Sequence, residues 1–172
     1  MEIDWIRPSS ELFIKNLLIA YPLEFFIGSV HHVHNTPIDY DHEMYAQARE
    51  IAGGSDERIF EDYFDLQFSM LKALKPPIVG HFDVIRLKAD DPNGSFKRLE
   101  GVWQRISRNL DFIADYGGAM ELNSAALRKG MLEPYPNAEV CKVGVVGTAP
   151  TLSHGSKLLT GVPREGGTVH AF

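Results

Sequence analysis

Cysteine is almost absent from this chain, since Cys141 is the only one among 172 residues. A single thiol excludes an internal disulfide and any metal cage built from thiolates, so a reducing compartment, the cytoplasm, is the default expectation. Long hydrophobic runs are also missing, and none approaches the roughly 20 residues of a membrane span. Glu2 and Asp4 interrupt the N-terminal pattern, and no basic segment precedes an apolar one. We therefore expect neither a signal peptide nor a membrane-spanning helix.

Positive charge is scarce as well. Lysine and arginine number 17 against 23 aspartates and glutamates, which gives a formal net charge of -6 at pH 7. Nucleic acids and anionic membranes both attract basic surfaces, so this balance argues against either as the main partner. A small anionic substrate remains compatible with the charge, because a local pocket can bind it. The oligomeric state is not predicted.

What the chain does contain is the composition of an ordinary globular protein, with 44% hydrophobic and 23% charged residues. This length and composition favour one domain with a hydrophobic core. From about Val143 onward, glycine and proline recur and no apolar periodicity persists. We therefore expect a folded part over residues 1–142 and a glycine-rich, poorly ordered tail over residues 143–172.

Hydrophobic periodicity predicts alternating strands and helices. We expect strands over residues 2–6, 25–34, 78–81 and 119–123, and helices over residues 11–21, 44–51, 56–75, 96–116 and from 138 onward. This order is typical of βαβ units and hence of an α/β fold with a largely parallel sheet. Four strands do not close a barrel, so the sheet is either open or part of something larger.

Histidines occur where two of these strands end. His31 and His81 occupy such positions, and Glu2 on the first strand is a possible carboxylate contributor. The carboxyl ends of parallel strands lie at one edge of a sheet, where ligands and metals gather. Imidazole and carboxylate donors suit Zn²⁺, Mn²⁺ or Fe²⁺. The alternative, that both histidines are hydrogen-bonded structural residues, stays open on the sequence alone.

Several neighbours are weaker candidates. Strand alternation sends His32 to the face opposite His31, and His34 falls in the following loop. Asp83 either accepts a hydrogen bond from a ligand imidazole, fixing its tautomer, or takes an ordinary surface or turn position.

Two arginines follow strand ends and are candidates for binding a phosphate group. Arg86 follows the third expected strand and Arg128 the fourth, where Asn123 offers further donors. An arginine binds phosphate through two parallel hydrogen bonds, which a lysine does not copy. The alternative is that both arginines are solvated charges at helix starts, and the residues alone favour it slightly.

Several ordered blocks between Glu2 and Lys142 closely resemble histidinol-phosphate phosphatases of the PHP (polymerase and histidinol phosphatase) superfamily, in particular their fungal-type branch. The blocks are Glu2-Ile3-Asp4-Trp5, Phe26-Ile27-Gly28-Ser29-Val30-His31-His32-Val33-His34, Pro37-Ile38-Asp39-Tyr40-Asp41, Ile78-Val79-Gly80-His81-Phe82-Asp83-Val84-Ile85-Arg86, Glu121-Leu122-Asn123-Ser124-Ala125-Ala126-Leu127-Arg128-Lys129-Gly130 and Glu133-Pro134-Tyr135-Pro136. Their number and order make the resemblance more specific than any single motif does.

The resemblance implies a distorted (β/α)7 barrel with up to three divalent metal ions at the carboxyl ends of its strands. The implied reaction is hydrolysis of L-histidinol phosphate to L-histidinol and phosphate in histidine biosynthesis, through metal-activated water. By resemblance, Glu2, His31 and His81 match metal ligands, with Glu2 bridging two ions. Arg86 and Arg128 match residues that we assign to the substrate phosphate. We expect Asn123 to assist them and Asp83 to act in catalysis.

The chain departs from the family pattern at both ends. The family begins with a His-x-His strand, which is not found near this N-terminus. Its late block supplies an aspartate and a histidine, whereas Thr151-Leu152-Ser153-His154-Gly155 offers only His154 as a candidate metal ligand. We therefore expect the central part of a barrel, truncated at the N-terminus and aberrant at the C-terminus. The alternatives are a non-catalytic fragment with an incomplete metal site, or a PHP hydrolase of another phosphate ester.

Overall fold

The computed structural model of the protein describes residues 1–144, and its centre is a parallel four-stranded sheet in the order β1-β2-β5-β6. The strands are β1 (Glu2–Asp4), β2 (Ile27–Ser29), β5 (Ile78–Val79) and β6 (Ala119–Met120). All three neighbouring pairs are parallel. The expected α/β class with parallel strands is confirmed, and over the described residues the sheet is open.

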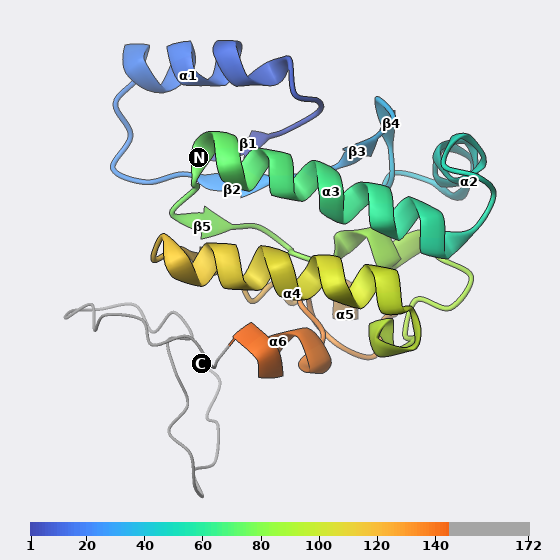
Figure 1. Cartoon of the computed structure of the whole chain (residues 1–172). Helices are drawn as coiled ribbons and strands as arrows, with labels where there is room; N and C mark the ends of the chain where they lie inside the picture. Colours follow the sequence, from blue (N-terminus) through green and yellow to red (C-terminus); the bar gives the residue numbers. More distant parts are fainter. Residues whose placement is uncertain (145–172) are drawn as a thin grey trace, which may run out of the picture.

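Helices connect the strands of the sheet. They are α1 (Ser10–Ala20), α2 (His42–Ile51), α3 (Asp56–Leu74), α4 (Glu100–Asp115), α5 (Ala125–Arg128) and α6 (Ala138–Gly144), with 3-10 turns η1 (Val84–Lys88) and η2 (Phe96–Arg98). Figure 1 shows α3 and α4 side by side in front of the strands. In the part of the chain that the structure describes, no helix combines the length and apolar character needed to cross a membrane.

Helix α3 illustrates how the sequence sets an element. Ser55 caps its start by accepting the Arg58 N–H at 3.3 Å, and acidic residues fill the first turn, where they complement the helix dipole. The helix ends at Lys75, whose φ of 44° is left-handed. Its inner face forms much of the core through Ile59, Phe60, Tyr63, Phe64, Gln67, Met70 and Leu71.

The two faces of the sheet differ in chemistry. Ile3, Gly28 and Val79 are in register and buried on the helix side. A Cβ on Gly28 would lie 2.8 Å from Pro76, so glycine permits the close approach of the chain that follows α3. Since side chains alternate along a strand, Glu2 and Asp4 point to the opposite face. The polar chemistry therefore gathers on the face that α3 and α4 leave free.

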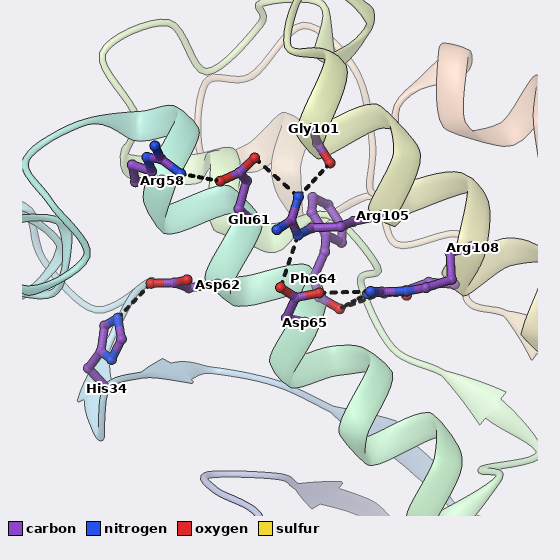
Figure 2. A network of polar contacts seen from close by, with 10 residues as sticks. His34, Arg58, Glu61, Asp62, Phe64, Asp65, Gly101, Arg105 and Arg108 are labelled. Atoms are coloured by element: carbon purple, nitrogen blue, oxygen red, sulfur yellow. Dashed lines mark hydrogen bonds and ion pairs between the residues drawn. The ribbon is translucent and has the colours of Figure 1, made fainter.

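Ion pairs join α3 to α4 on the outside of the molecule (Figure 2). Arg105 donates to Glu61 at 3.1 Å, to Asp65 at 2.9 Å and to the Gly101 carbonyl at 3.0 Å. Arg108 donates to Asp65 at 2.8 Å, so one carboxylate on α3 receives two arginines from α4. This network holds α3 and α4, the two helices in front of the sheet, together.

Replacing Arg105 by alanine is expected to lower the free energy of unfolding by about 1–2 kcal/mol, because several partly exposed contacts of roughly 0.2–1 kcal/mol each are lost together. Arg58→Ala is the matched control: its side chain is 67% exposed, and within residues 1–144 it pairs only with Glu61. Urea unfolding at low and high salt measures the loss of stability in both variants. Equal losses for the two variants would show that the network does not join the helices.

Two elements predicted from the sequence differ from the structure. One strand was predicted over residues 25–34, but β2 ends at Ser29 and a new hairpin follows, in which β3 (His32–Val33) pairs antiparallel with β4 (Thr36–Pro37). Its turn places His34 and Asn35 at φ of 52° and 63°, so the strand cannot continue. The helix predicted over residues 96–116 is divided at Leu99 into η2 and α4. Val143 and Gly144 extend α6, and the rest of the predicted tail lies outside the described residues.

Candidate metal centre

Three predicted metal ligands meet beside the strand ends. Glu2 Oε1 lies 3.0 Å from His81 Nε2 and 3.7 Å from His31 Nε2. The two imidazole rings are 4.6 Å apart between centroids. Within residues 1–144 this is the one group of His, Cys, Asp or Glu side chains whose ligand atoms lie close enough to hold a metal ion, all within 4.8 Å of one another.

The backbone of three neighbouring strands positions this triad. Glu2 begins β1, while His31 and His81 each follow the last residue of their strand by two positions. His81 has a φ of 20°, at the border of the left-handed region, which is uncommon for a residue with a side chain. Such a conformation persists only where the surroundings hold it.

Asp4 is a residue of this site that the sequence analysis did not select. Its Oδ1 accepts the His31 backbone N–H at 3.1 Å and lies 3.3 Å from His31 Nδ1. A proton on Nδ1 satisfies this carboxylate and leaves the Nε2 lone pair facing Glu2. Asp4 is therefore placed to favour the tautomer that a metal ligand at Nε2 needs.

The placement predicted for His32 was wrong. Its Nδ1 lies 3.0 Å from Asp4 Oδ2, so His32 shares a carboxylate with His31 instead of pointing to the opposite face. The alternation that predicted opposite faces fails because β2 ends at Ser29, before either histidine. His34, in the β3–β4 turn, instead pairs with Asp62 of α3 at 2.8 Å, as Figure 2 shows.

Charge at the site favours a cation. Burial alone would raise the pKa values of the Glu2 and Asp4 carboxyls. For Glu2, hydrogen bonds from Ser29 and His81 and the charges of both triad histidines outweigh burial and lower the pKa. For Asp4, hydrogen bonds from His31 and the charges of His31 and His32 do the same. Burial would lower the pKa of His31, yet the hydrogen bond to Asp4 and the charges of Asp39, Asp4 and Glu2 raise it. Carboxylates thus dominate the surroundings of both imidazoles.

The donor set fits one divalent ion. Two imidazole nitrogens and one carboxylate oxygen form a familiar zinc ligand set, which leaves a further position for water or substrate. Nδ1 of His81 is buried and has no hydrogen-bond partner among the described residues. A buried polar atom normally has a partner, so this nitrogen beside the triad indicates that the site holds a further group besides the described side chains.

Asp83 and Arg86 form a buried ion pair. Asp83 Oδ2 accepts from Arg86 Nε at 3.0 Å and from the Asn137 N–H at 2.9 Å. Arg86 also donates to three backbone carbonyls, and its side chain is only 3% exposed. Burial raises the pKa of Asp83 to about 6, although Arg86 opposes this rise.

The surface positions considered for Asp83 and Arg86 were wrong, because long-range contacts bury both residues. The hydrogen bond that Asp83 was considered to accept from a ligand imidazole is not among the contacts of residues 1–144. Their roles in catalysis and phosphate binding stay predictions.

The other predicted site residues lie around β6 and α5. Asn123 donates from Nδ2 to Glu121 at 3.1 Å, and its Oδ1 accepts the Ala125 N–H at 2.8 Å. Arg128 is the last residue of α5; it is exposed, and its side chain makes no hydrogen bond or ion pair within residues 1–144. His154 lies outside the described residues. The phosphate-binding roles of Asn123 and Arg128 and the metal-binding role of His154 stay predictions.

Comparison with known proteins decides the family. A family model described as the PHP domain matches residues 1–125. The chain belongs to the PHP domain family. Its triad therefore lies within the matched part of a PHP domain.

Two fungal relatives of this PHP chain carry names that agree with the resemblance. The probable histidinol-phosphatase of Schizosaccharomyces pombe is 40% identical over 157 residues, covering 90% of this chain and 51% of the relative. The histidinol-phosphatase of Saccharomyces cerevisiae is 34% identical over 141 residues, covering 70% of this chain and 42% of the relative. The chain thus spans about half the length of the curated relatives that it matches.

A solved structure supports the fold. The crystal structure of a candidate histidinol phosphatase from Listeria monocytogenes matches with a TM-score of 0.74 and 21% sequence identity. The match covers 87% of this chain and 59% of the Listeria chain. The open parallel sheet of this PHP chain therefore corresponds to part of a larger fold.

Proposed function

We propose that this PHP chain carries the metal site of a phosphatase that hydrolyses L-histidinol phosphate to L-histidinol and phosphate in histidine biosynthesis. The observation that carries the proposal is the convergence of Glu2, His31 and His81 within 4.8 Å inside a PHP domain. The names of the two fungal relatives support the substrate. Because the chain spans about half of each relative, activity and substrate are proposals for this chain.

Each residue of the centre has a definite part in this chemistry. His31 and His81 would offer Nε2 and Glu2 a carboxylate oxygen, while Asp4, 3.3 Å from His31 Nδ1, would favour the proton on that nitrogen. When bound, a divalent ion polarises a phosphoryl oxygen and lowers the pKa of coordinated water. Its positive charge also offsets the carboxylates, which would otherwise repel a phosphate ester.

The arginines differ in how free they are to bind the substrate phosphate. The exposed guanidinium of Arg128 is available for a bidentate contact, so we propose Arg128 as a phosphate-binding residue. Arg86 is engaged by Asp83 and by backbone carbonyls, so a phosphate contact from Arg86 requires this network to open. Asp83 and Asn123 remain proposed site residues.

The proposal also covers the number of bound metal ions, the cellular compartment and the partners. The described triad accounts for one ion, and the family resemblance implies up to three ions of Zn, Mn or Fe. Metal analysis of the purified chain measures how many are bound. We propose a cytoplasmic enzyme without nucleic-acid or membrane partners, on the grounds of its single cysteine and net charge of -6.

Phosphate release by the purified chain tests the function. With Zn²⁺, Mn²⁺ or Fe²⁺ added, we expect release from L-histidinol phosphate that stops on chelation and returns when metal is restored. Glycerol phosphate and phenyl phosphate, which lack the imidazole and amine of the substrate, are expected to react more slowly. A chain that binds metal but hydrolyses none of these esters would contradict the proposal and favour a non-catalytic metal site. Faster hydrolysis of another ester would favour a different PHP phosphatase.

A further inference from the structure

A carboxylate outside the triad holds the backbone of His81. Glu121 follows the last residue of β6, and its Oε2 accepts the His81 N–H at 3.0 Å. The register, which pairs Val79 with Met120, brings Glu121 beside Gly80 and next to His81. The contact therefore follows from the pairing of β5 with β6.

Both backbone groups of His81 are engaged. Its N–H donates to Glu121 and its carbonyl accepts the Val84 N–H at 2.9 Å. These two hydrogen bonds flank a φ of 20°, which a residue with a side chain rarely adopts unless it is held there. The same residue extends Nε2 to within 3.0 Å of Glu2 Oε1. The direction of the imidazole thus depends on a backbone conformation that Glu121 stabilises.

Glu121 is itself held in place. Its Oε1 accepts Asn123 Nδ2 at 3.1 Å, and the Asn123 amide is oriented by the Ala125 N–H, which its Oδ1 accepts at 2.8 Å. Both carboxylate oxygens of Glu121 therefore accept hydrogen bonds from fixed donors. The resulting chain of contacts runs from the start of α5 to the backbone of His81.

We propose that Glu121 is a positioning residue that sets His81 for metal binding, with Asn123 orienting the carboxylate. The inference rests on the proposed metal site and adds a residue that the triad does not include. His31 has a similar support, since Asp4 on the adjacent strand accepts its backbone N–H at 3.1 Å. Each histidine of the centre is thus held by a carboxylate from a neighbouring strand. We assign Glu121 a role through His81, because its carboxylate oxygens accept the His81 N–H and Asn123 Nδ2 and it lies outside the group of three side chains whose ligand atoms converge.

Zinc binding by the full chain tests this role, with Zn²⁺ alone as the probe in titration calorimetry. Glu121→Ala removes the acceptor and is expected to weaken zinc binding by about 10–100-fold, the usual effect of losing support behind a metal ligand. Glu121→Gln keeps a carbonyl oxygen for the His81 N–H but turns an NH2 group toward the Asn123 donor, so its zinc affinity is expected to fall by less than that of Glu121→Ala. Glu100→Ala, on the exposed start of α4, is the matched control and is expected to leave zinc affinity unchanged.

A second measurement reads the backbone contact without metal. Hydrogen exchange of the His81 amide, followed by NMR in the metal-free chain, is expected to speed up by about tenfold or more in Glu121→Ala and to change little in Glu121→Gln. If Glu121→Ala does not fold, Asn123→Ala replaces it, because it removes the donor to Oε1 and is expected to give smaller changes in the same direction.

The outcomes separate the two proposals. Unchanged exchange at His81 in Glu121→Ala would overturn the positioning role, as would a glutamine variant that loses as much zinc affinity as the alanine variant. If the unmodified chain binds no zinc, the proposed metal site fails. The exchange rate of the His81 amide then decides alone whether Glu121 holds this backbone.

Discussion

Replacing His81 by alanine is expected to lower the affinity of the chain for Zn²⁺ by at least about 100-fold. Removing this imidazole leaves two of the three described donors, and losing a ligand costs more than losing the support behind one, which is worth about 10–100-fold. His81 is also the ligand with the closest contact to Glu2, at 3.0 Å. Competition with a chromophoric zinc chelator measures the dissociation constant, and circular dichroism shows whether the variant is folded.

His34→Ala is the matched control for this experiment. His34 is a histidine of the block that contains His31, but it contacts Asp62 on α3 and lies outside the triad. We expect its removal to leave zinc affinity within about twofold, because no donor of the centre changes. If folded His81→Ala binds zinc as tightly as the unmodified chain, then the triad does not hold the ion.

Replacing Arg86 by alanine is expected to lower the free energy of unfolding by about 3–5 kcal/mol, the cost of leaving a buried charge without its partner. Asp83 would be left in a fully buried position, and three backbone carbonyls would lose a donor. Because small domains are stable by only about 5–15 kcal/mol, this loss would be a large part of the free energy of unfolding. Urea unfolding of the metal-free chain measures the change.

A double variant separates the ion pair from simple loss of packing. Asp83→Leu combined with Arg86→Met removes both charges and fills similar volume, so it is expected to be more stable than Arg86→Ala. Arg58→Ala, at an exposed ion pair, is the control and is expected to cost less than about 1 kcal/mol. A loss of less than about 1 kcal/mol in Arg86→Ala would contradict the structural importance of this pair.

Local patterns were sufficient to predict the parallel strands of the centre, and together with the family resemblance they singled out Glu2, His31 and His81 as candidate ligands. His31 and His81 were considered because parallel strands deliver their carboxyl ends to one edge, and Glu2 because it lies on the neighbouring first strand; the structure brings these three side chains together. The helix over residues 56–75 was predicted well because apolar spacing and the proline pair that follows it are encoded within the segment itself.

The supporting residues were missed, although two of them left a signal. Asp4 lies two residues after Glu2 on the same strand, so strand periodicity already places both carboxylates on one face. Glu121 was passed over because the predicted strand was extended to Asn123 and only its terminal amide was considered. Both carboxylates act through the register of neighbouring strands, and that register is not visible in a single segment.

Burial of Arg86 had no local signal at all. Two of its acceptors, the carbonyls of Glu133 and Pro134, are more than 40 residues away along the chain. Likewise, the division of the predicted helix at Leu99 follows a distant contact, since Glu139 accepts the Ser95 hydroxyl and the Phe96 N–H. Tertiary contacts of this range override local preference, and the sequence of one segment does not contain them.

The most direct test of the metal centre is anomalous diffraction from crystals of the chain grown with Zn²⁺, recorded at the zinc absorption edge. A metal held by the triad gives an anomalous peak about 2.0–2.2 Å from Glu2 Oε1, His31 Nε2 and His81 Nε2. A peak that contacts all three atoms is the expected result. At saturating zinc, the absence of a peak among these atoms, or ligation by other side chains alone, would contradict the metal centre and the function proposed from it.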